Sequence, residues 1–288
     1  MRASKHEGTG NDFIVVLDPD DALRLTVGQV RLLCDRRRGV GADGIIRVGP
    51  GRQGADLSME LRNADGGTAE MSGNGIRCLA QAAVDGGLVS PPRFTVATAA
   101  GVRTVDFVAG ESPGWARASV DMGPVTLGPD QPQDFENRKA RTADVGNPHL
   151  VLFGPEVATV DVAVLGPKLQ SPFEDGINVE WICLAGDGVG DGNGDGNGDG
   201  NGNGAGRSLD LRVWERGAGE TLACGTGSVA AAAAARSWGV VDPDGPVRVR
   251  NPGGTLEVTL GARPGDPAFL AGPVRKVADI DIHPGLLS

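Results

Sequence analysis

Two alanine-rich segments and a series of short β-branched segments define the expected secondary structure of this chain. Alanine and leucine occur at helical density over residues 75–85 and 227–238, and this pattern predicts one helix in each segment. The segments "RFTVAT", "VRTVDFV", "VRVRN" and "TLEVTL" alternate apolar and polar residues or cluster β-branched ones, which predicts strands. Cys34 and Cys183 fall in an expected helix and an expected strand, so we interpret both as core residues.

These elements occur twice in the same order. The segment "AEMSGNGIRCLAQAAVDGGLV" aligns with "TLACGTGSVAAAAAARSWGVV", and the alignment places Ser72 on Cys224 and Gly101 on Gly253 without a gap. Earlier in each half, "GNDFIVV" resembles "GNPHLVL" and "DGIIRV" resembles "DGINVE". Each copy reads as short strands, a glycine loop, an apolar helix and a hairpin. We therefore expect an α+β fold with two pseudo-symmetric domains from an internal duplication, each a curved sheet around a central helix, with the active site in the cleft between them.

The repeat also sets the expected domain boundaries. We expect one domain over residues 1–122, completed by residues 275–288, and a second domain over residues 123–274. The second is interrupted at 186–206, where every even position is glycine. Such a segment loses much entropy on folding and buries little, so we expect a disordered surface loop. Its "DGNGDG" resembles the start of a calcium loop, but position twelve is Gly202 and not Glu, so we expect no metal.

Composition and charge narrow the class of protein. The chain has 288 residues, 40% of them hydrophobic, which is a globular composition. Its formal net charge of −10 argues against a nucleic-acid surface. Four cysteines are too few for a disulfide framework, the first residues lack the apolar core of a secretion signal, and the longest apolar run is too short to span a bilayer. We therefore expect a cytoplasmic protein without a membrane or nucleic-acid partner.

A cysteine at the start of an expected helix is the first candidate for chemistry. Cys224 precedes Gly225, Thr226 and an alanine run, so its thiol lies at a helix N-terminus. Backbone N–H groups and the positive end of the helix dipole favour a thiolate there, and they also bind carboxylates. A thiolate beside a bound carboxylate is a candidate base for removing a proton from Cα. Read alone, the same cysteine fits a small buried residue equally well.

The matching loop in the first half repeats this arrangement. Ser72 stands at the position of Cys224, and Gly73 and Asn74 follow it at a second expected helix N-terminus. Two such ends facing one carboxylate would place a catalytic group on each face of Cα, and inversion of a stereocentre requires that geometry. One group removes a proton and the other delivers one, without a cofactor. Cys78 lies a turn inside the helix, and we interpret it as a core residue.

Six motifs together resemble the diaminopimelate epimerase family. They are "GTGNDFIVV", "DRRRGVGADG", "RNADGGTAEMSGNGIRC", "VGNPH", "DGINVE" and "ERGAGETLACGTG", and the resemblance runs along the chain apart from the glycine-rich insert. It implies a cofactor-independent isomerase, without pyridoxal phosphate, that interconverts LL- and meso-diaminopimelate for lysine and peptidoglycan synthesis. It also implies a homodimer, two pseudo-symmetric domains, and two catalytic cysteines, one in each domain.

The resemblance assigns roles to residues of this sequence. It makes Cys224 one catalytic residue, places Glu215 at the reacting amine and near Cys224, and gives His149 the tuning of the opposite catalytic residue. The residues implied to hold the reacting carboxylate are Gly73, Asn74, Gly225 and Thr226. The remaining implied substrate ligands, chiefly for the distal amino-acid end, are Asn11, Asn63, Asn147, Asn178 and Arg216.

Two positions depart from the family pattern. The family has a cysteine where this chain has Ser72, and often a side-chain amide where it has Gly44. A serine hydroxyl is a much weaker acid than a thiol and needs an adjacent base for activation. Three hypotheses therefore remain open: a diaminopimelate epimerase with Ser72 as the second acid/base; a related isomerase or one-base lyase that acts on another amino acid with Cys224 alone; and a non-catalytic amino-acid-binding paralogue or sensor.

Overall fold

The structure of the chain is a computed structural model. It describes residues 1–69, 71–131, 138–186 and 208–287. From residue 187 onward, the glycine-rich segment that was expected to be a disordered loop lies outside the described residues.

The chain forms two compact units. The first comprises Met1–Asp121 with Ala271–Ser288, and the second comprises Met122–Leu270. The chain therefore passes from one unit to the other twice, within strands β8 (Trp115–Pro124) and β17 (Pro267–Asp281).

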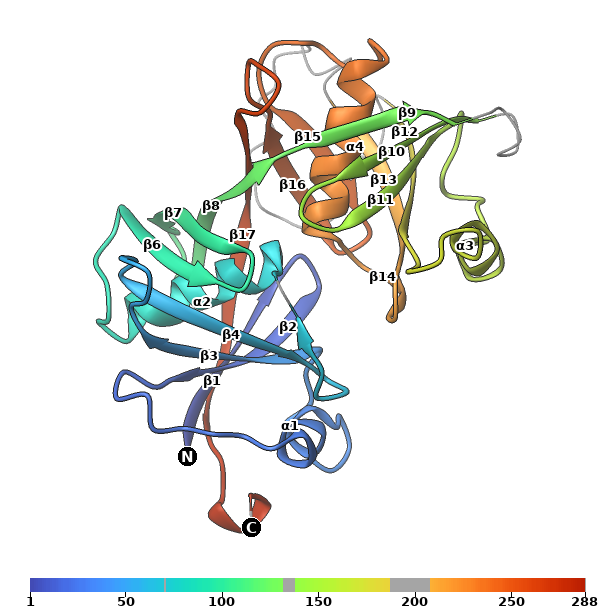
Figure 1. Ribbon diagram of the computed structural model, residues 1–288. Helices are drawn as coiled ribbons and strands as arrows, with labels where there is room; N and C mark the ends of the chain where they lie inside the picture. Colours follow the sequence, from blue (N-terminus) through green and yellow to red (C-terminus); the bar gives the residue numbers. More distant parts are fainter. Residues whose placement is uncertain (70, 132–137, 187–207, 288) are drawn as a thin grey trace. The chain divides into compact units, whose positions relative to one another are not determined.

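The first unit consists mainly of strands with two α-helices among its described residues (Figure 1). In addition to its parts of β8 and β17, its elements are β1 (Arg2–Gly8), β2 (Asn11–Leu17), α1 (Val27–Cys34), β3 (Gly44–Pro50), β4 (Leu57–Asn63), β5 (Thr68–Ala69), α2 (Gly73–Asp85), β6 (Arg93–Thr98) and β7 (Gly101–Ala109). A short 3₁₀ helix, Pro284–Leu286, follows β17.

Helix α2 lies at the centre of the first unit. It packs against β1, β2, β3, β4 and β7, and each residue from Gly73 to Ala83 is buried. A helix enclosed on all sides has no face for solvated side chains, so most of its residues are small or apolar, and its buried Arg77 and Gln81 have hydrogen-bond partners within the protein. Cys78 is fully buried within it, as expected of a core residue.

A separate apolar cluster holds α1 in the first unit. Thr26 and Gln29 form a capping box at the start of the helix, and the buried face of the helix carries Val30, Leu33 and Cys34. These side chains pack with apolar residues of β2 and β3. The prediction of Cys34 as a helical core residue is confirmed.

The second unit repeats the order of elements. Its described elements, besides its parts of β8 and β17, are β9 (Thr126–Asp130), β10 (Lys139–Asp144), β11 (Pro148–Phe153), α3 (Val162–Gln170), β12 (Asn178–Leu184), β13 (Ser208–Glu215), β14 (Gly219–Thr221), α4 (Gly225–Ser237), β15 (Val247–Asn251) and β16 (Gly254–Thr259). Helix α4 lies among the strands of this unit (Figure 1), packs against β10 to β13, β15 and β16, and is buried from Gly225 to Ala235.

The expected helices and hairpins are present. Both central helices begin two residues before the expected position, at Gly73 and Gly225, because the glycines of the two loops already belong to the first helical turn. The strands expected from "RFTVAT", "VRTVDFV", "VRVRN" and "TLEVTL" form the hairpins β6–β7 and β15–β16. Cys183 is buried in β12, which confirms it as a core residue.

Strand pairing corrects one match between the two halves. Parallel strands β2 and β3 place Phe13 opposite Gly44, and parallel strands β11 and β12 place His149 opposite Asn178. Because the flanking motifs align Phe13 with His149, Gly44 corresponds to Asn178. The sequence match of "DGIIRV" with "DGINVE" paired Gly44 with Gly176 and is wrong by two residues. Short apolar strands carry little that fixes their register, which hydrogen bonding and packing then decide.

Candidate functional site

Ser72 caps the N-terminus of α2. Its backbone is extended, with φ −140° and ψ 118°, and its Oγ accepts the Gly75 N–H at 3.0 Å. Gly73 and Asn74 follow it as buried residues of the first turn. The first N–H groups of a helix have no acceptor within the helix, so this end of α2 is suited to binding a carboxylate.

A buried polar network stands behind the first turn of α2. Asn74 Oδ1 accepts hydrogen bonds from Arg77 Nη2 at 3.0 Å and from the Thr9 hydroxyl at 3.3 Å. The Arg77 side chain is fully buried, and burial lowers its pKa to about 10, which leaves it charged at neutral pH. Sequence reasoning did not single out Arg77, although a charged residue within the apolar run of a central helix is a signal of a buried network.

Asn11 and Asn63 both lie at strand ends in the first unit. Asn11 begins β2, where its Oδ1 lies 3.5 Å from Asn74 Nδ2 and its own Nδ2 donates to Asp43 Oδ2 at 2.6 Å. Asn63 ends β4 with an exposed side chain, opposite Gly44 at the start of β3. The fold thus brings Asn11 and Asn74 into contact and places Asn63 beside the first residue of β3.

Gly44 has little room for a side chain. A Cβ atom at this position would lie 2.6 Å from the Arg62 carbonyl oxygen and 3.3 Å from the Phe13 ring. A side-chain amide here would therefore require a backbone shift. The corresponding position in the second unit, Asn178, carries the amide that Gly44 lacks.

Cys224 caps α4 as Ser72 caps α2. Its backbone has φ −121° and ψ 119°, and its Sγ accepts the Gly227 N–H at 3.4 Å. The Thr226 hydroxyl lies 3.5 Å from the same sulfur. The cysteine is 5% exposed, and Gly225 and Thr226 are also buried.

The surroundings of Cys224 raise the pKa of its thiol. Burial raises the pKa of Cys224 well above its usual value, and the carboxylates of Glu215 and Glu180 raise it further. Hydrogen bonds from Thr226 and Gly227 lower this pKa but do not outweigh the burial. The expected effect of the helix end is present, because the Gly227 N–H favours the thiolate, but burial of the thiol has a larger and opposite effect on its pKa.

Glu215 lies beside Cys224. It ends β13, where the Thr221 hydroxyl donates to its Oε1 at 2.5 Å. Burial raises the pKa of Glu215, while hydrogen bonds with Thr221 and Cys224 lower it. Glu215 thus shares a hydrogen bond with the candidate catalytic thiol. A cation bound to this carboxylate would offset its negative charge and lower the pKa of the thiol.

The Asn178 side chain bridges two backbone segments of the second unit. Its Nδ2 donates to the Pro148 carbonyl at 3.2 Å, and its Oδ1 accepts the Arg216 N–H at 2.9 Å. The exposed Arg216 side chain donates to the Asp175 carbonyl at 2.9 Å. Asn178 therefore positions the backbone from which the Arg216 guanidinium extends.

His149 lies in the same unit as Cys224. The ring is fully buried in β11, with Nδ1 2.6 Å from Glu180 Oε1 and Nε2 3.0 Å from Asn147 Oδ1. The tuning of Ser72 by His149 stays a prediction. Glu180 was missed by sequence reasoning, and the signal for it is one acidic residue inside the apolar strand "NVEWICL".

Comparison with known proteins decides the family. The sequence profile described as "Diaminopimelate epimerase" matches residues 3–128 and 141–277. The chain belongs to the diaminopimelate epimerase family. A diaminopimelate epimerase from Thermobifida fusca is 39% identical over 299 residues, which cover 98% of each chain. Another, from Mycolicibacterium paratuberculosis, is 38% identical over 286 residues, which cover 90% of each chain. The family read from the sequence motifs is confirmed.

Solved structures share the α+β fold of this family member at low sequence identity. A phenazine biosynthesis protein of the PhzF family from Bacillus anthracis superposes with a TM-score of 0.72 at 16% identity, covering 98% of this chain and 99% of that chain. A methylitaconate-delta-isomerase superposes with a TM-score of 0.62 at 14% identity, covering 97% of this chain and 94% of that chain. These likenesses concern the fold.

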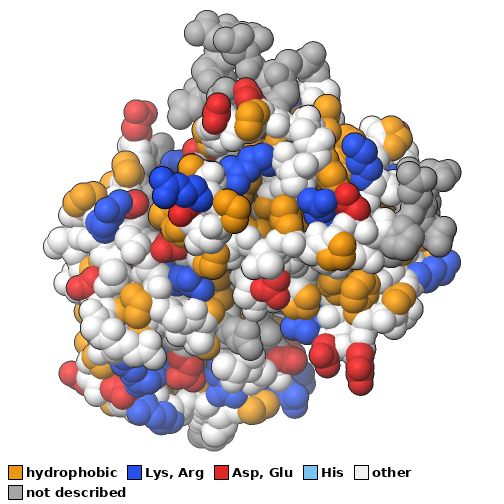
Figure 2. All heavy atoms as spheres, turned by 45° about the horizontal axis from the view of Figure 1, so that its top comes forward, with side chains coloured by type: hydrophobic (Ala, Val, Ile, Leu, Met, Phe, Trp, Pro, Cys, Tyr) orange, Lys and Arg blue, Asp and Glu red, His pale blue; other side chains and the backbone are white. Residues whose placement is uncertain are grey.

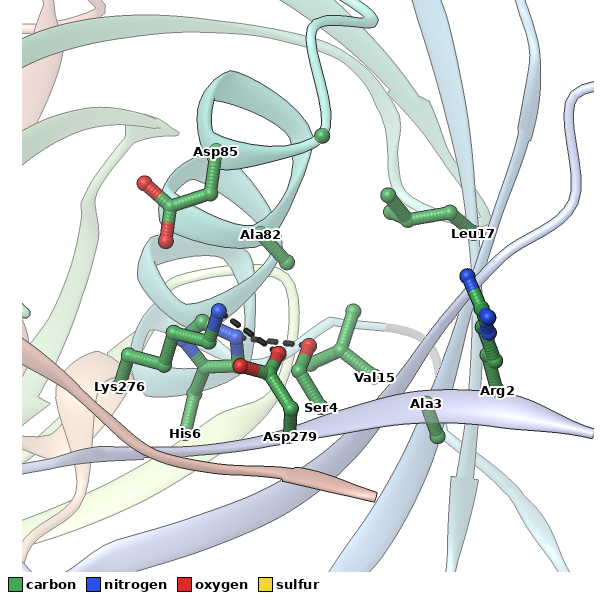
Figure 3. Close-up of a pocket in the computed structure, with 11 residues that line it drawn as sticks. Arg2, Ala3, Ser4, His6, Val15, Leu17, Ala82, Asp85, Lys276 and Asp279 are labelled. Carbon is green, nitrogen blue, oxygen red and sulfur yellow. Dashed lines mark hydrogen bonds and ion pairs between the residues drawn. The ribbon is translucent and has the colours of Figure 1, made fainter. Parts of the chain in front are cut away.

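The first unit also contains a pocket of about 240 Å³ (Figure 3). It is lined by Ala82 and Asp85 of α2, by His6, and by Lys276, which pairs with Asp279 at 2.7 Å. These α2 residues are in its last turn, whereas Ser72 caps its first. A helix of 13 residues is about 20 Å long. This pocket is therefore separate from the candidate carboxylate site.

The surface has charged side chains of both signs. On the face shown in Figure 2, basic and acidic side chains of the described residues are interspersed. Among the helices described, none is long and apolar enough to cross a membrane.

Proposed function

We propose that this chain is a diaminopimelate epimerase that interconverts LL- and meso-diaminopimelate, with Cys224 and Ser72 acting at Cα. The observation that carries the proposal is the shared position of these two residues. Each caps a buried 13-residue helix, and each accepts the N–H three residues further along. In a member of this family, that equivalence supports Ser72 as the counterpart of Cys224.

The proposal includes the arrangement of the chain that two-sided chemistry requires. The domains would comprise 1–122 with 275–288, and 123–274, as pseudo-symmetric products of an internal duplication, each a curved sheet around its central helix. The active site would lie in the cleft between them. Support comes from the repeated order of elements and from the capped, buried helix in each compact unit.

The reacting carboxylate would be held by the N–H groups at the two helix starts. The residues that would contribute are Gly73, Asn74, Gly225 and Thr226. The buried Arg77 guanidinium, hydrogen-bonded to Asn74, adds positive charge behind the first of these helix ends. Positive charge and fixed N–H groups stabilise the negative charge that develops on the carboxylate when Cα loses its proton.

Substrate binding would make Cys224 a better base. The reacting ammonium would pair with Glu215 and offset the carboxylate that, after burial, most raises the pKa of Cys224. The Cys224 thiolate would then take the Cα proton, and the bond's electron pair would move into the carboxylate. The Ser72 hydroxyl would donate its proton to the opposite face of Cα. The thiol and the alkoxide left behind would return to their starting states by proton exchange with water.

The distal amino-acid end would be recognised by a second set of polar side chains. Arginine offers a planar pair of donors to a carboxylate, and asparagine serves either an amine or a carboxylate. The proposed ligands are Asn11, Asn63, Asn147, Asn178 and Arg216. His149 would tune the catalytic residue opposite Cys224.

Hydrogen exchange at Cα tests the proposal directly. The protein is incubated in deuterated water with LL- or meso-diaminopimelate separately, and deuterium incorporation and stereochemistry are followed by mass spectrometry and chiral chromatography. Exchange with inversion from both isomers is expected, and Cys224→Ala is expected to abolish it. Exchange with retention from one isomer would indicate a one-base enzyme. Binding without exchange would indicate an amino-acid sensor, and either result would overturn the proposal.

We also propose that the chain works as a cytoplasmic homodimer in lysine and peptidoglycan precursor synthesis, without pyridoxal phosphate. The support is its membership of the family. Light scattering coupled to size-exclusion chromatography tests the assembly, because a monomer at the concentrations where the enzyme is active would contradict a functional dimer.

A further inference from the structure

Glu180 and His149 form a buried polar pair beside α4. Both side chains are fully buried, and Glu180 Oε1 lies 2.6 Å from His149 Nδ1. The other carboxylate oxygen, Oε2, is buried without a partner among the described residues. A buried carboxylate is unfavourable unless it is paired, so Glu180 depends on His149 to offset its burial.

The fold itself does not require this pair. In the first unit, the residue corresponding to His149 is Phe13. Glu180 lies opposite Val151 and Ile46 lies opposite Val15, so the strand registers make Ile46 the residue that corresponds to Glu180. The glycines in the first turns of the central helices confirm the match. A Cβ at Gly227 would meet Glu180 at 2.7 Å, and the corresponding atom at Gly75 would meet Ile46 at 3.2 Å. The same core position is thus apolar in the first unit and ionisable in the second unit, which carries Cys224.

A chain of hydrogen bonds leads from this pair to the Cys224 sulfur. His149 Nε2 lies 3.0 Å from Asn147 Oδ1, and Asn147 Nδ2 donates to Thr226 Oγ1 at 3.3 Å. Thr226 Oγ1 in turn lies 3.5 Å from Cys224 Sγ. Four contacts therefore connect the buried carboxylate to the candidate catalytic atom, and all five residues belong to the second unit.

The chain has a direction. Asn147 accepts from His149 through its oxygen and donates to Thr226 through its nitrogen, so the Thr226 hydroxyl hydrogen is free to point at the sulfur. A sulfur that accepts hydrogen bonds from Thr226 and from the Gly227 N–H is stabilised as a thiolate. If the His149 ring turned away from Asn147, the Asn147 amide could turn as well. Thr226 would then donate to Asn147, and the sulfur would lose one donor.

We propose that Glu180 is a positioning residue for Cys224: it holds the His149 ring in place and so fixes the direction of the Asn147–Thr226 hydrogen bonds toward the sulfur. This inference rests on the proposed function of Cys224 as the base at Cα. It gives the buried carboxylate a role that the apolar counterpart, Ile46, does not have.

Two carboxylates also change the pKa of the thiol directly, through their charge. Glu215 on β13 and Glu180 on β12 each raise the pKa of Cys224 by their negative charge. His149 on β11 faces Glu180 and not the sulfur. The charge of Glu180 therefore raises the pKa of Cys224, whereas its hydrogen-bond chain lowers it. Removing Glu180 should shift this pKa in a direction that shows which of the two effects is larger.

The test is a titration of the thiolate by its ultraviolet absorbance in Glu180→Gln. Subtracting the same titration of a protein that also carries Cys224→Ala removes the signal of the other cysteines. If Glu180 acts through the chain, Glu180→Gln moves the titration to higher pH, with about a tenfold lower thiolate fraction at a given pH. If Glu180 acts only as a charge, the titration moves to lower pH. A shift to lower pH or no shift overturns the inference.

Two further variants make the result decisive. Glu220→Gln removes a carboxylate of the same unit that pairs with Arg212, and it should leave the titration unchanged. The double variant Glu180→Ile with His149→Phe installs the side chains found in the first unit, so it should fold and show the same shift even if Glu180→Gln does not fold. The titration requires no turnover, so the inference fails or stands independently of the deuterium exchange that tests the proposed function.

Discussion

Ser72 Oγ accepts the Gly75 N–H at 3.0 Å, and Cys224 Sγ accepts the Gly227 N–H at 3.4 Å. The two side chains thus hold the same place at the start of two central helices, one with oxygen and the other with sulfur. Geometry is shared between them, whereas acidity is not. The two capping positions therefore differ in one side-chain atom and in the groups around it, and several measurable consequences follow from these differences.

Replacing Ser72 with Cys should accelerate epimerisation. A thiol is more acidic than a hydroxyl by several pKa units, so proton transfer on that face of Cα becomes easier, and we expect an increase of at least about tenfold in kcat. Steady-state rates with LL- and meso-diaminopimelate measure the change. A slower Ser72→Cys enzyme would mean that the site depends on the smaller oxygen atom.

Replacing Ser72 with Ala should separate inversion from exchange. Without the hydroxyl, Cys224 can still remove and return a proton on its own face, so the isomer that presents its Cα proton to Cys224 should exchange with retention. Inversion should fall by about 10²- to 10⁴-fold. Loss of the helix cap should also lower the free energy of unfolding by about 1 kcal/mol, which urea denaturation measures. Unchanged inversion would remove Ser72 from the mechanism.

Replacing Glu215 with Gln should move the thiolate titration of Cys224 to lower pH. The substitution removes the carboxylate whose charge raises the pKa of this thiol most, although burial, the larger cause, remains. The same variant should lose kcat/KM because the proposed amine ligand is gone. Glu220→Gln is the matched control for charge. If the two variants titrate alike, Glu215 does not act on the thiol.

Gly227→Ala and Gly75→Ala form a matched pair of substitutions. Each new Cβ would lie 3.2 Å from the Cβ of the capping residue, but the former would also lie 2.7 Å from Glu180 Oε1 and the latter 3.2 Å from Ile46 Cδ1. We expect Gly227→Ala to destabilise the protein by about 1–3 kcal/mol more than Gly75→Ala, because the carboxylate must leave His149. Chemical denaturation of both variants measures the difference, and equal effects would contradict it.

Acid should destabilise the protein through His6. Burial lowers the pKa of His6 from 6.5 to about 4, despite a hydrogen bond with Gln81. Between pH 6.5 and pH 4 the unfolded chain therefore binds a proton at His6 that the folded chain does not bind. The free energy of unfolding is not reduced by His6 above pH 6.5, and it decreases as the pH falls from 6.5 toward 4. The loss amounts to about 3 kcal/mol at most.

Urea denaturation across this pH range checks the assignment to His6. His6→Gln should flatten the acid limb of the stability curve. The exposed His283 provides the control, because His283→Gln should leave that limb unchanged. An acid limb that persists in His6→Gln would assign the effect to another group.

Local sequence determined the elements and the two capping positions. A glycine loop followed by an apolar run predicts a helix start, and Ser72 and Cys224 therefore stand at equivalent places whatever surrounds them. The core roles of Cys34, Cys78 and Cys183 also follow from the sequence, since a small residue in an apolar stretch is buried in almost any packing.

Only the tertiary structure decided register and long-range pairing. The correspondence between Gly44 and Asn178 depends on which residue lies opposite each of them in its own pair of parallel strands. The sequences of short apolar strands fit more than one register. The hydrogen bonds of Arg77 to Thr9 and the contact of Glu180 with His149 likewise join residues from different parts of the chain. The balance of effects on the pKa of Cys224 also depends on the fold. A helix dipole can be read from the sequence, but desolvation and two neighbouring carboxylates exist only once the chain has folded.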